Sequence, residues 1–380
     1  MFTLDFLQHY WWFLISLLGA LLVFLLFVQG GQALLYALGR SERERTLIVN
    51  SLGRKWEFTF TTLVTFGGAF FASFPLFYST SFGGACYVWF AILMVFVIQA
   101  VAYEFRHKPA NVLGGKTFNV FLLVNGFAGP LLLGTALGTL YTGAPFTVDR
   151  LNMADMNGDN IISQWTTPWH GLEAVASPAL LLGIAVALLS MLLGCHHLLH
   201  DTGDDTLRER TRKLAGRGAL PFLLFFLAWL ALLLTGEGYA ADPDTGVIVA
   251  EPYRYLRSLA RMPALSCTLI SGIILVATGL LKGCRGSRAA IRFSGTGTVL
   301  TVLALLLLAG WNGTAYYPSV ADLQSSLTIR NSSSSLFTLR VMSMVSLLIP
   351  IIFAYVFHAW RAISNRPLTS EEVEAEEHSY

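Results

Sequence analysis

The feature that most constrains this chain is a series of long apolar runs separated by short charged segments. A run of about 20 apolar residues is long enough for a helix to cross a bilayer. Only 13% of the residues are charged, against about 25% in soluble domains. We therefore predict an all-α polytopic membrane protein with nine transmembrane helices. Their expected positions are about 11–38, 57–79, 84–105, 118–142, 172–197, 219–239, 263–282, 291–317 and 336–360.

Lysine and arginine are concentrated in alternate loops, and loops on the cytoplasmic side of a membrane carry an excess of these residues. The loops 39–56, 106–117, 198–218 and 283–292, together with Lys282 and the C-terminal tail, hold 19 of the 25 basic residues. This pattern predicts that these loops and the C-terminus face the cytoplasm and that the N-terminus lies outside. An odd number of spans agrees with that orientation, whereas eight spans would break the alternation.

The order of the runs indicates a single transmembrane domain, 1–366, followed by an acidic cytoplasmic tail, 367–380. Within the domain we expect two four-helix halves, 1–142 and 172–317, with the last helix at 336–360 outside them. The segments between the runs are too short to form separate domains.

Three classes of protein or segment are disfavoured by composition. The net charge of +2 and a pI near 8.3 indicate no nucleic-acid partner. The apolar run 10–38 is too long for the core of a signal peptide and lacks a basic segment before it. The four cysteines show no CxxC spacing, so we expect no disulfide framework.

Two acidic residues lie at predicted helix ends on the cytoplasmic side. Glu57 follows Trp56 at the start of the second run, and Glu104 precedes Arg106 at the end of the third. The predicted topology places both carboxylates at one depth in the membrane, on adjacent helices joined by a tight outer turn. Acids at this depth are costly and are found in proton relays. Glu57 and Glu104 are therefore candidates for proton uptake from the cytoplasm, and the alternative is that each pairs with a nearby arginine and anchors a helix end.

Polar residues inside the runs suggest contacts between helices. Gln29 and Gln32 are expected to form hydrogen bonds between helices. Asn125, with Pro130 beyond it, suggests a kinked helix whose freed backbone groups face protein.

Histidine is the residue type that would indicate a metal or haem site. His196 and His200 have the i,i+4 spacing of a metal pair, but no carboxylate motif accompanies them. His358 is well inside an apolar run, where a packing role is favoured over haem ligation. The segment Asp155–Ser163 resembles a calcium loop but lacks the glycine at its sixth position and the glutamate at its twelfth. We therefore predict no metal site and no haem in this chain.

Several separate motifs resemble those of subunit II of the cytochrome bd quinol oxidases. They are ERTLIVNSLGRKWEFTF (Glu44–Phe60), GGAFFASFPLFYSTSFGGACY (Gly67–Tyr87), VAYEFR (Val101–Arg106), PFTVD (Pro145–Asp149) and the segment Ser326–Trp360. The ending HSY is also similar to the terminal HSLY of that family. The resemblance covers nearly the whole chain in the same order.

The resemblance implies a function that residue patterns alone do not give. Subunit II pairs with subunit I, which carries the b and d haems and oxidises quinol, and together they reduce dioxygen to water with protons from the cytoplasm of a bacterium. The resemblance implies no haem in this chain, and a structural quinone, lipid and a small single-helix subunit as further partners. It also places the family's Trp–acid pair on Trp56 and Glu57, and the acid before an arginine on Glu104 and Arg106.

The chain departs from the family pattern in its first run. Many members have Asp-Gly-Phe-Asp where this chain reads Phe27–Gln32, and many have arginine where Gln99 stands.

Two alternative functions follow from the residues alone. A secondary transporter would show broken helices with polar residues at the bilayer centre. A purely structural membrane subunit would have no part in proton movement.

Overall fold

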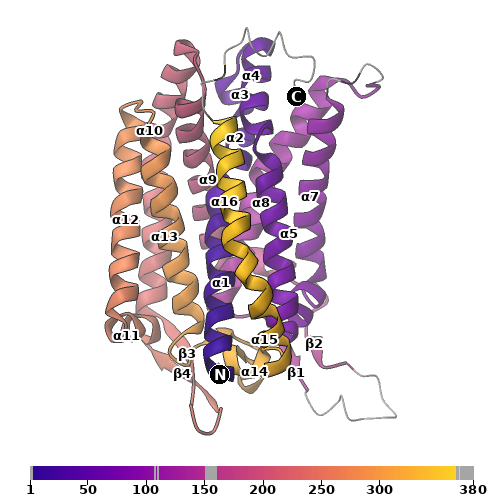
Figure 1. Ribbon diagram of the computed structural model, residues 1–380, viewed down its shortest axis with the longest axis vertical. Coiled ribbons are helices and arrows are strands. Elements are labelled where there is room, and N and C mark those ends of the chain that lie inside the picture. The colour runs from indigo at the N-terminus through magenta and orange to yellow at the C-terminus, as the bar shows by residue number, and fades with distance from the viewer. Residues whose placement is uncertain (1–2, 107, 109–110, 150–160, 365–367, 369–380) are drawn as a thin grey trace.

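The computed structural model describes residues 3–106, 108, 111–149, 161–364 and 368, which form a bundle of long helices (Figure 1). Within these residues, eight helical segments are long and apolar enough to cross a membrane, or nine when the bent pair Glu42–Ser73 and Pro75–Gly83 is counted as a span. The predicted all-α polytopic membrane fold is thus confirmed.

The long helices are α1 (Leu4–Leu25) with its continuation α2 (Phe27–Ala33), α5 (Trp56–Ser73), α7 (Cys86–Phe105), α8 (Gly115–Thr142), α9 (Ala179–Asp201), α10 (Asp205–Thr235), α12 (Pro263–Cys284), α13 (Ala290–Gly310) and α16 (Ile349–Ile363). The short helices are α3 (Leu35–Leu38), α4 (Glu42–Gly53), α6 (Pro75–Phe77), α11 (Arg254–Arg261), α14 (Ile329–Ser332), α15 (Leu336–Val345), the π-helix η1 (Tyr78–Gly83) and the 3-10 helices η3 (Leu172–Ala176), η4 (Leu323–Ser325) and η5 (Ser346–Leu348).

The two ends of the bundle differ in kind. One end, which we call the strand end, holds the start of α1 and three antiparallel two-stranded ribbons (Figure 1). The ribbons pair β1 (Phe146–Val148) with β2 (Ser163–Trp165), β3 (Glu237–Ala241) with β4 (Ile248–Pro252), and β5 (Ala315–Tyr317) with β6 (Leu327–Thr328). The opposite end, which we call the basic end, holds α3, α4 and the turns between α9 and α10 and between α12 and α13 (Figure 1).

Two expected segment boundaries are wrong. The segment 198–218 was expected to be a loop, but α10 begins at Asp205, four residues after α9 ends at Asp201. The side chain of Asp204 caps α10 by accepting a hydrogen bond from the backbone N–H of Leu207. Ion pairs from Glu209 to Arg212 and Lys213, at i,i+3 and i,i+4, then support the charged first turns as helix.

The expected tight turn between the second and third spans is also wrong. After Ser73 the chain enters α6 at Pro75, bends by 118° and continues as the π-helix η1 before α7 begins at Cys86. Proline is favoured at the first position of a helix because its fixed φ suits the start and its missing N–H is not needed there.

The first helix and its continuation contact four of the other long helices. α1 packs against α5 and α13, and α2 packs against α8 and α9. This close approach depends on glycine: a Cβ added at Gly30 would lie 1.8 Å from the backbone oxygen of Ser190 on α9. A Cβ at Gly126 of α8 would lie 2.3 Å from the backbone nitrogen of Ala33. The residues of α2 are consequently all buried.

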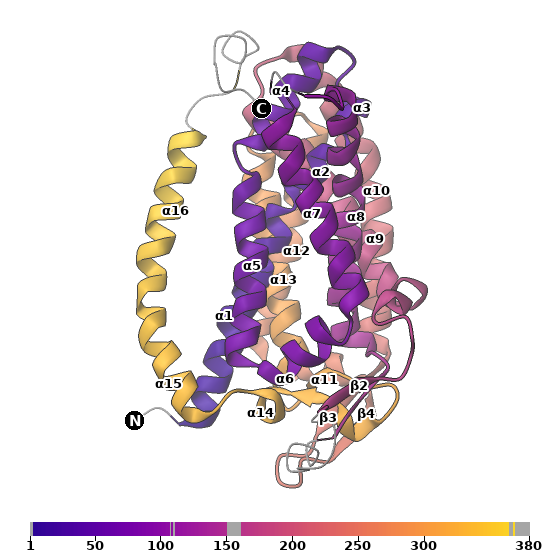
Figure 2. The ribbon, with the colours of Figure 1, turned by 90° about the vertical axis from the view of Figure 1, so that its right-hand side faces the viewer.

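The last helix is peripheral. Figure 2 shows α16 standing apart from the other long helices, and none of its residues is buried. Its Trp360 ring reaches the bundle near the basic end, with ring centroids 5.4 to 6.4 Å from those of Phe24, Phe27 and Phe58.

Candidate functional site

The start of α5 and the end of α7 meet at the basic end through an aromatic pair. The rings of Trp56 and Tyr103 are stacked with centroids 5.7 Å apart and planes 15° from parallel. Trp56 directly precedes Glu57, and Tyr103 directly precedes Glu104. The stack therefore holds the two acids at the same height along the axis of the bundle. Both acidic side chains are exposed, and no hydrogen bond or ion pair joins them within the described residues.

The two acids have different surroundings. Glu57 lies in the first turn of α5, where the helix dipole favours a negative charge. Glu104 is 3.2 Å from the Nζ atom of Lys108, and both side chains are more than half exposed. Such a surface pair contributes little to stability. Neither acid is locked into a buried ion pair among the described residues, so both carboxylates remain accessible.

Arg106 makes a contact that the sequence did not predict. Its guanidinium is buried and donates to Glu42 Oε1 at 3.0 Å, and to Thr46 Oγ1 at 3.4 Å, rather than pairing with Glu104. Burial lowers the pKa of Arg106 and the charge of Glu42 opposes that shift. Arg106 therefore ties the end of α7 to α4, the short helix that leads into Trp56.

A buried ion pair, also not predicted, fixes the corner between α4 and α5. Lys55 Nζ lies 3.1 Å from Asp201 Oδ1, and both side chains are almost fully buried. The other carboxylate oxygen accepts a hydrogen bond of 2.5 Å from the Ser51 hydroxyl and lies 3.6 Å from His197 Nε2. Because Lys55 immediately precedes Trp56 and Glu57, this network holds the start of α5 against the end of α9.

A sequence signal for this network existed. His197 and Asp201 are four residues apart, and this spacing brings side chains together on one face of a helix. Lys55 is 146 residues from Asp201, so no local pattern could have identified it as the partner.

Inside the bundle a cluster of amides joins α2, α7 and α8. The Gln99 Oε1 atom accepts hydrogen bonds from Gln29 at 2.7 Å and from Gln32 at 2.8 Å, and a further bond from Asn125. Gln32 also donates to the Tyr103 hydroxyl at 2.9 Å. The expected role of Gln29 and Gln32 in linking helices is confirmed. None of the four amides of this cluster ionises, so the cluster has no carboxylate or guanidinium where many members of the family are expected to have them.

Within the described residues, the candidate histidines do not fit a haem or a metal ion. His196 Nδ1 is 2.9 Å from the Ser294 hydroxyl, and its ring lies so close to Gly283 that an added Cβ there would be 2.1 Å from Nε2. His200 Nδ1 instead faces the backbone oxygen of Arg288 at 3.1 Å. The described residues contain no group of three or more His, Cys, Asp or Glu side chains able to hold a metal. His358 is exposed on α16, and the calcium-like stretch 155–160 lies outside the described residues.

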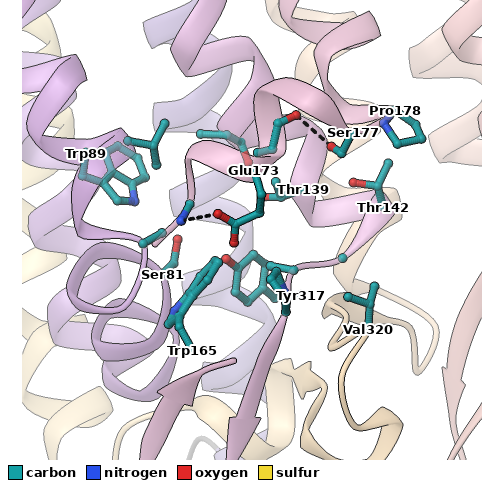
Figure 3. A pocket seen from close by; sticks show the side chains of 18 residues that line it. Ser81, Trp89, Thr139, Thr142, Trp165, Glu173, Ser177, Pro178, Tyr317 and Val320 are labelled. Atoms are coloured by element: carbon teal, nitrogen blue, oxygen red, sulfur yellow. Dashed lines mark hydrogen bonds between the residues drawn. The ribbon is translucent and has the colours of Figure 1, made fainter. Parts of the chain in front are cut away.

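A cavity of about 340 Å³ opens at the strand end between α7, α8 and the ribbons (Figure 3). Its walls are mostly apolar, with the indole rings of Trp89 and Trp165 and the hydroxyl groups of Ser81 and Thr139. The Glu173 carboxylate accepts a hydrogen bond from the backbone N–H of Gly171 at 2.9 Å (Figure 3). It accepts another from the Thr167 hydroxyl at 3.0 Å. Because both oxygens are used by its own turn, Glu173 serves to shape the cavity wall.

Comparisons with known proteins agree with one another. The family model described as cytochrome bd terminal oxidase subunit II matches residues 7–363. The chain is 28% identical, over the full length of both, to the cytochrome bd-I ubiquinol oxidase subunit 2 of Escherichia coli (strain K12). It is also 28% identical to the cytochrome bd ubiquinol oxidase subunit 2 of Bacillus subtilis (strain 168), covering 95% of this chain and 98% of the relative.

A solved structure has the same fold. A chain in the structure of bd oxidase from Geobacillus thermodenitrificans matches with a TM-score of 0.56 and 12% sequence identity. The match covers 93% of this chain and 98% of that one. At this identity the likeness concerns the fold alone.

Proposed function

The chain belongs to the family of subunit II of cytochrome bd terminal oxidases, and we propose that it supplies protons to a haem-bearing partner while performing no redox step itself. Membership makes it a subunit of a quinol oxidase complex of aerobic electron transport. The family match over residues 7–363 is the observation that carries this assignment, and it gives no support to the alternative of a secondary transporter.

The haems, b and d, belong in this proposal to the partner, subunit I. An iron of this kind needs an axial ligand such as histidine within a helix. His196 and His197 are the buried histidines of the long helices, and both are engaged with Ser294 or with the Asp201 network. The buried histidines that the structure describes do not fit a haem, which supports a redox centre in the partner.

Proton supply is assigned to Glu57 and Glu104. The observation that supports it is the Trp56–Tyr103 stack, which holds two exposed acids at one level of the basic end. Since loops rich in Lys and Arg face the cytoplasm, this end would face the compartment from which the protons come. Both carboxylates are open to a neighbouring chain, and the Lys55–Asp201 and Arg106–Glu42 pairs hold the helix ends that carry them.

The location and remaining partners follow the family. We place the complex in the bacterial cytoplasmic membrane, with the N-terminus outside, and expect bound lipid and a small single-helix subunit beside subunit I. For a structural quinone, the strand-end cavity is the candidate site, because its indole rings suit a flat ring and its hydroxyl groups can donate to ring oxygens. Extraction and quantification of quinone from the purified complex, with Trp89→Ala as the cavity variant, tests that assignment.

The proton role is tested in the complex purified from membranes through a tag on this chain. Glu57→Gln and Glu104→Gln remove a titratable group while keeping side-chain size. We expect quinol-driven oxygen uptake per haem to fall by about a hundredfold or more, the lower end of what a lost proton-transfer group costs. Glu209→Gln is the matched control, because Glu209 is an exposed acid near the same end on α10. Unchanged turnover with full haem content in both variants would leave the purely structural subunit as the better account.

A further inference from the structure

A groove of about 800 Å³ separates the C-terminal half of α16, the half nearest the basic end, from the bundle. Its walls come from α1, α9, α13 with the turn before it, and α16. Trp360 closes part of it through its contacts with Phe24 and Phe27. This groove, which we call the α13–α16 groove, lies at the end opposite the strand-end cavity and takes no part in the proposed proton supply.

Three guanidinium groups line the groove at its outer edge. Arg288 lies in the turn before α13 and Arg292 in its first turn, and Arg361 reaches the groove from α16. All three are exposed, and among the described residues none of them makes an ion pair. Like charges gathered around one cavity repel one another unless an anion lies between them.

The acid that also lines the groove does not neutralise this charge. Asp201 faces it, but the Asp201 carboxylate is already balanced by the Lys55 ammonium and by the Ser51 hydroxyl. Among the described residues, the groove is therefore left with the positive charge of its three arginines.

Along α13 and α16 the lining of the groove changes from charged at the basic end to apolar farther from it. Along α13 the lining passes from Arg288 and Arg292 at the basic end to Val299, and along α16 it passes from Arg361 to Phe357. On α1 the deeper lining is Leu21 and Phe24. Charged groups at the bundle end with apolar walls below them match a molecule that has an anionic head and hydrocarbon tails.

We infer that the α13–α16 groove binds an anionic phospholipid, with its phosphate between Arg288, Arg292 and Arg361 and its acyl chains along Val299, Phe357 and Leu21. Basic pockets between transmembrane helices are known to bind anionic headgroups. The lipid would link α16, which has no buried residue of its own, to the rest of the bundle.

The test measures lipid affinity of the complex purified with its accompanying subunits. Native mass spectrometry of the delipidated complex gives the dissociation constants for phosphatidylglycerol and for phosphatidylcholine of the same chain length. We expect phosphatidylglycerol to bind more tightly, and Arg288→Gln/Arg292→Gln to weaken it on the order of 30-fold, about fivefold for each charge. Arg361→Gln alone should weaken it about fivefold, because the third charge comes from the other side of the groove.

Matched variants separate this site from general charge effects. Arg257→Gln/Arg261→Gln removes two exposed arginines from α11 at the strand end and should leave the affinity unchanged. Arg288→Lys/Arg292→Lys keeps the charge and should retain most of the binding, which also guards against a variant that misfolds. Equal binding of the two lipids, equal losses in the α11 control, or competition by inorganic phosphate as effective as by phosphatidylglycerol would overturn the inference.

Discussion

Replacing Lys55 with methionine tests whether the buried ion pair fixes the corner that carries Trp56 and Glu57. Lys55 Nζ lies 3.1 Å from Asp201 Oδ1, and the exposed fractions of the two side chains are only 1% and 6%. Methionine fills a similar volume but leaves the Asp201 carboxylate buried with the Ser51 hydroxyl and His197 as its remaining contacts. Removing one partner of a buried pair costs about 3–5 kcal/mol, because the other charge is left uncompensated.

The loss is measured as the change in the free energy of unfolding, by titrating dodecyl sulfate into detergent micelles that hold the purified complex. The double variant Lys55→Met/Asp201→Leu removes both charges and should recover most of the lost stability, since apolar replacements of buried pairs are often close to neutral. Lys213→Met breaks an exposed pair with Glu209 and should give no measurable change. A loss below about 1 kcal/mol for Lys55→Met, or a double variant less stable than the single one, would refute the reasoning, because a buried unpaired charge must cost more than that.

Two further predictions concern helix contacts and a helix cap. Gly30→Ala should destabilise the fold by about 1–3 kcal/mol, because its Cβ would lie 1.8 Å from the Ser190 backbone oxygen. Gly68→Ala on the exposed face of α5, where an added Cβ meets nothing within 4 Å, should instead stabilise by up to about 1 kcal/mol, and the two midpoints of unfolding in dodecyl sulfate show whether the signs differ. Asp204→Ala should cost about 1 kcal/mol by removing the α10 cap. The hydrogen bond from the Leu207 backbone N–H lowers the pKa of Asp204 in the folded protein. The stabilisation by this cap is therefore complete above the unfolded carboxyl's pKa of about 3.9 and is lost as the pH falls below it. If the difference in unfolding free energy between the wild type and Asp204→Ala grew on acidification, this reasoning would be contradicted.

The apolar runs predicted the membrane fold because each span must be apolar and must satisfy its own backbone hydrogen bonds in the bilayer. The basic residues predicted which loops share a side, because loops on the cytoplasmic side carry an excess of Lys and Arg. The sequence misassigned 198–218 because its charges were taken as solvent-exposed loop, whereas Glu209 pairs along a helix with Arg212 and Lys213. It identified Gln29 and Gln32 as interhelical contacts.

Partners brought together only by tertiary packing were beyond local patterns. Gln99 is 67 or more residues from the two glutamines that donate to it, and Lys55 is 146 residues from Asp201. The pairing of Arg106 with Glu42, 64 residues away, was missed for the same reason. Glu57 and Glu104 were identified as candidates from their position at helix ends and from the free-energy cost of placing a carboxylate at the membrane. Their role in proton supply stays a prediction.

The central claim is that this chain works beside a haem-bearing partner in a bd-type quinol oxidase. The most direct test is to purify the chain from native membranes through a tag and record the absorption difference between reduced and oxidised samples, with quinol-driven oxygen uptake measured on the same fraction. We predict reduced-haem bands of b and d type, a co-purifying larger chain that retains them, and oxygen uptake on addition of quinol. A pure, folded preparation with no reduced-haem bands and no oxygen uptake would contradict the account.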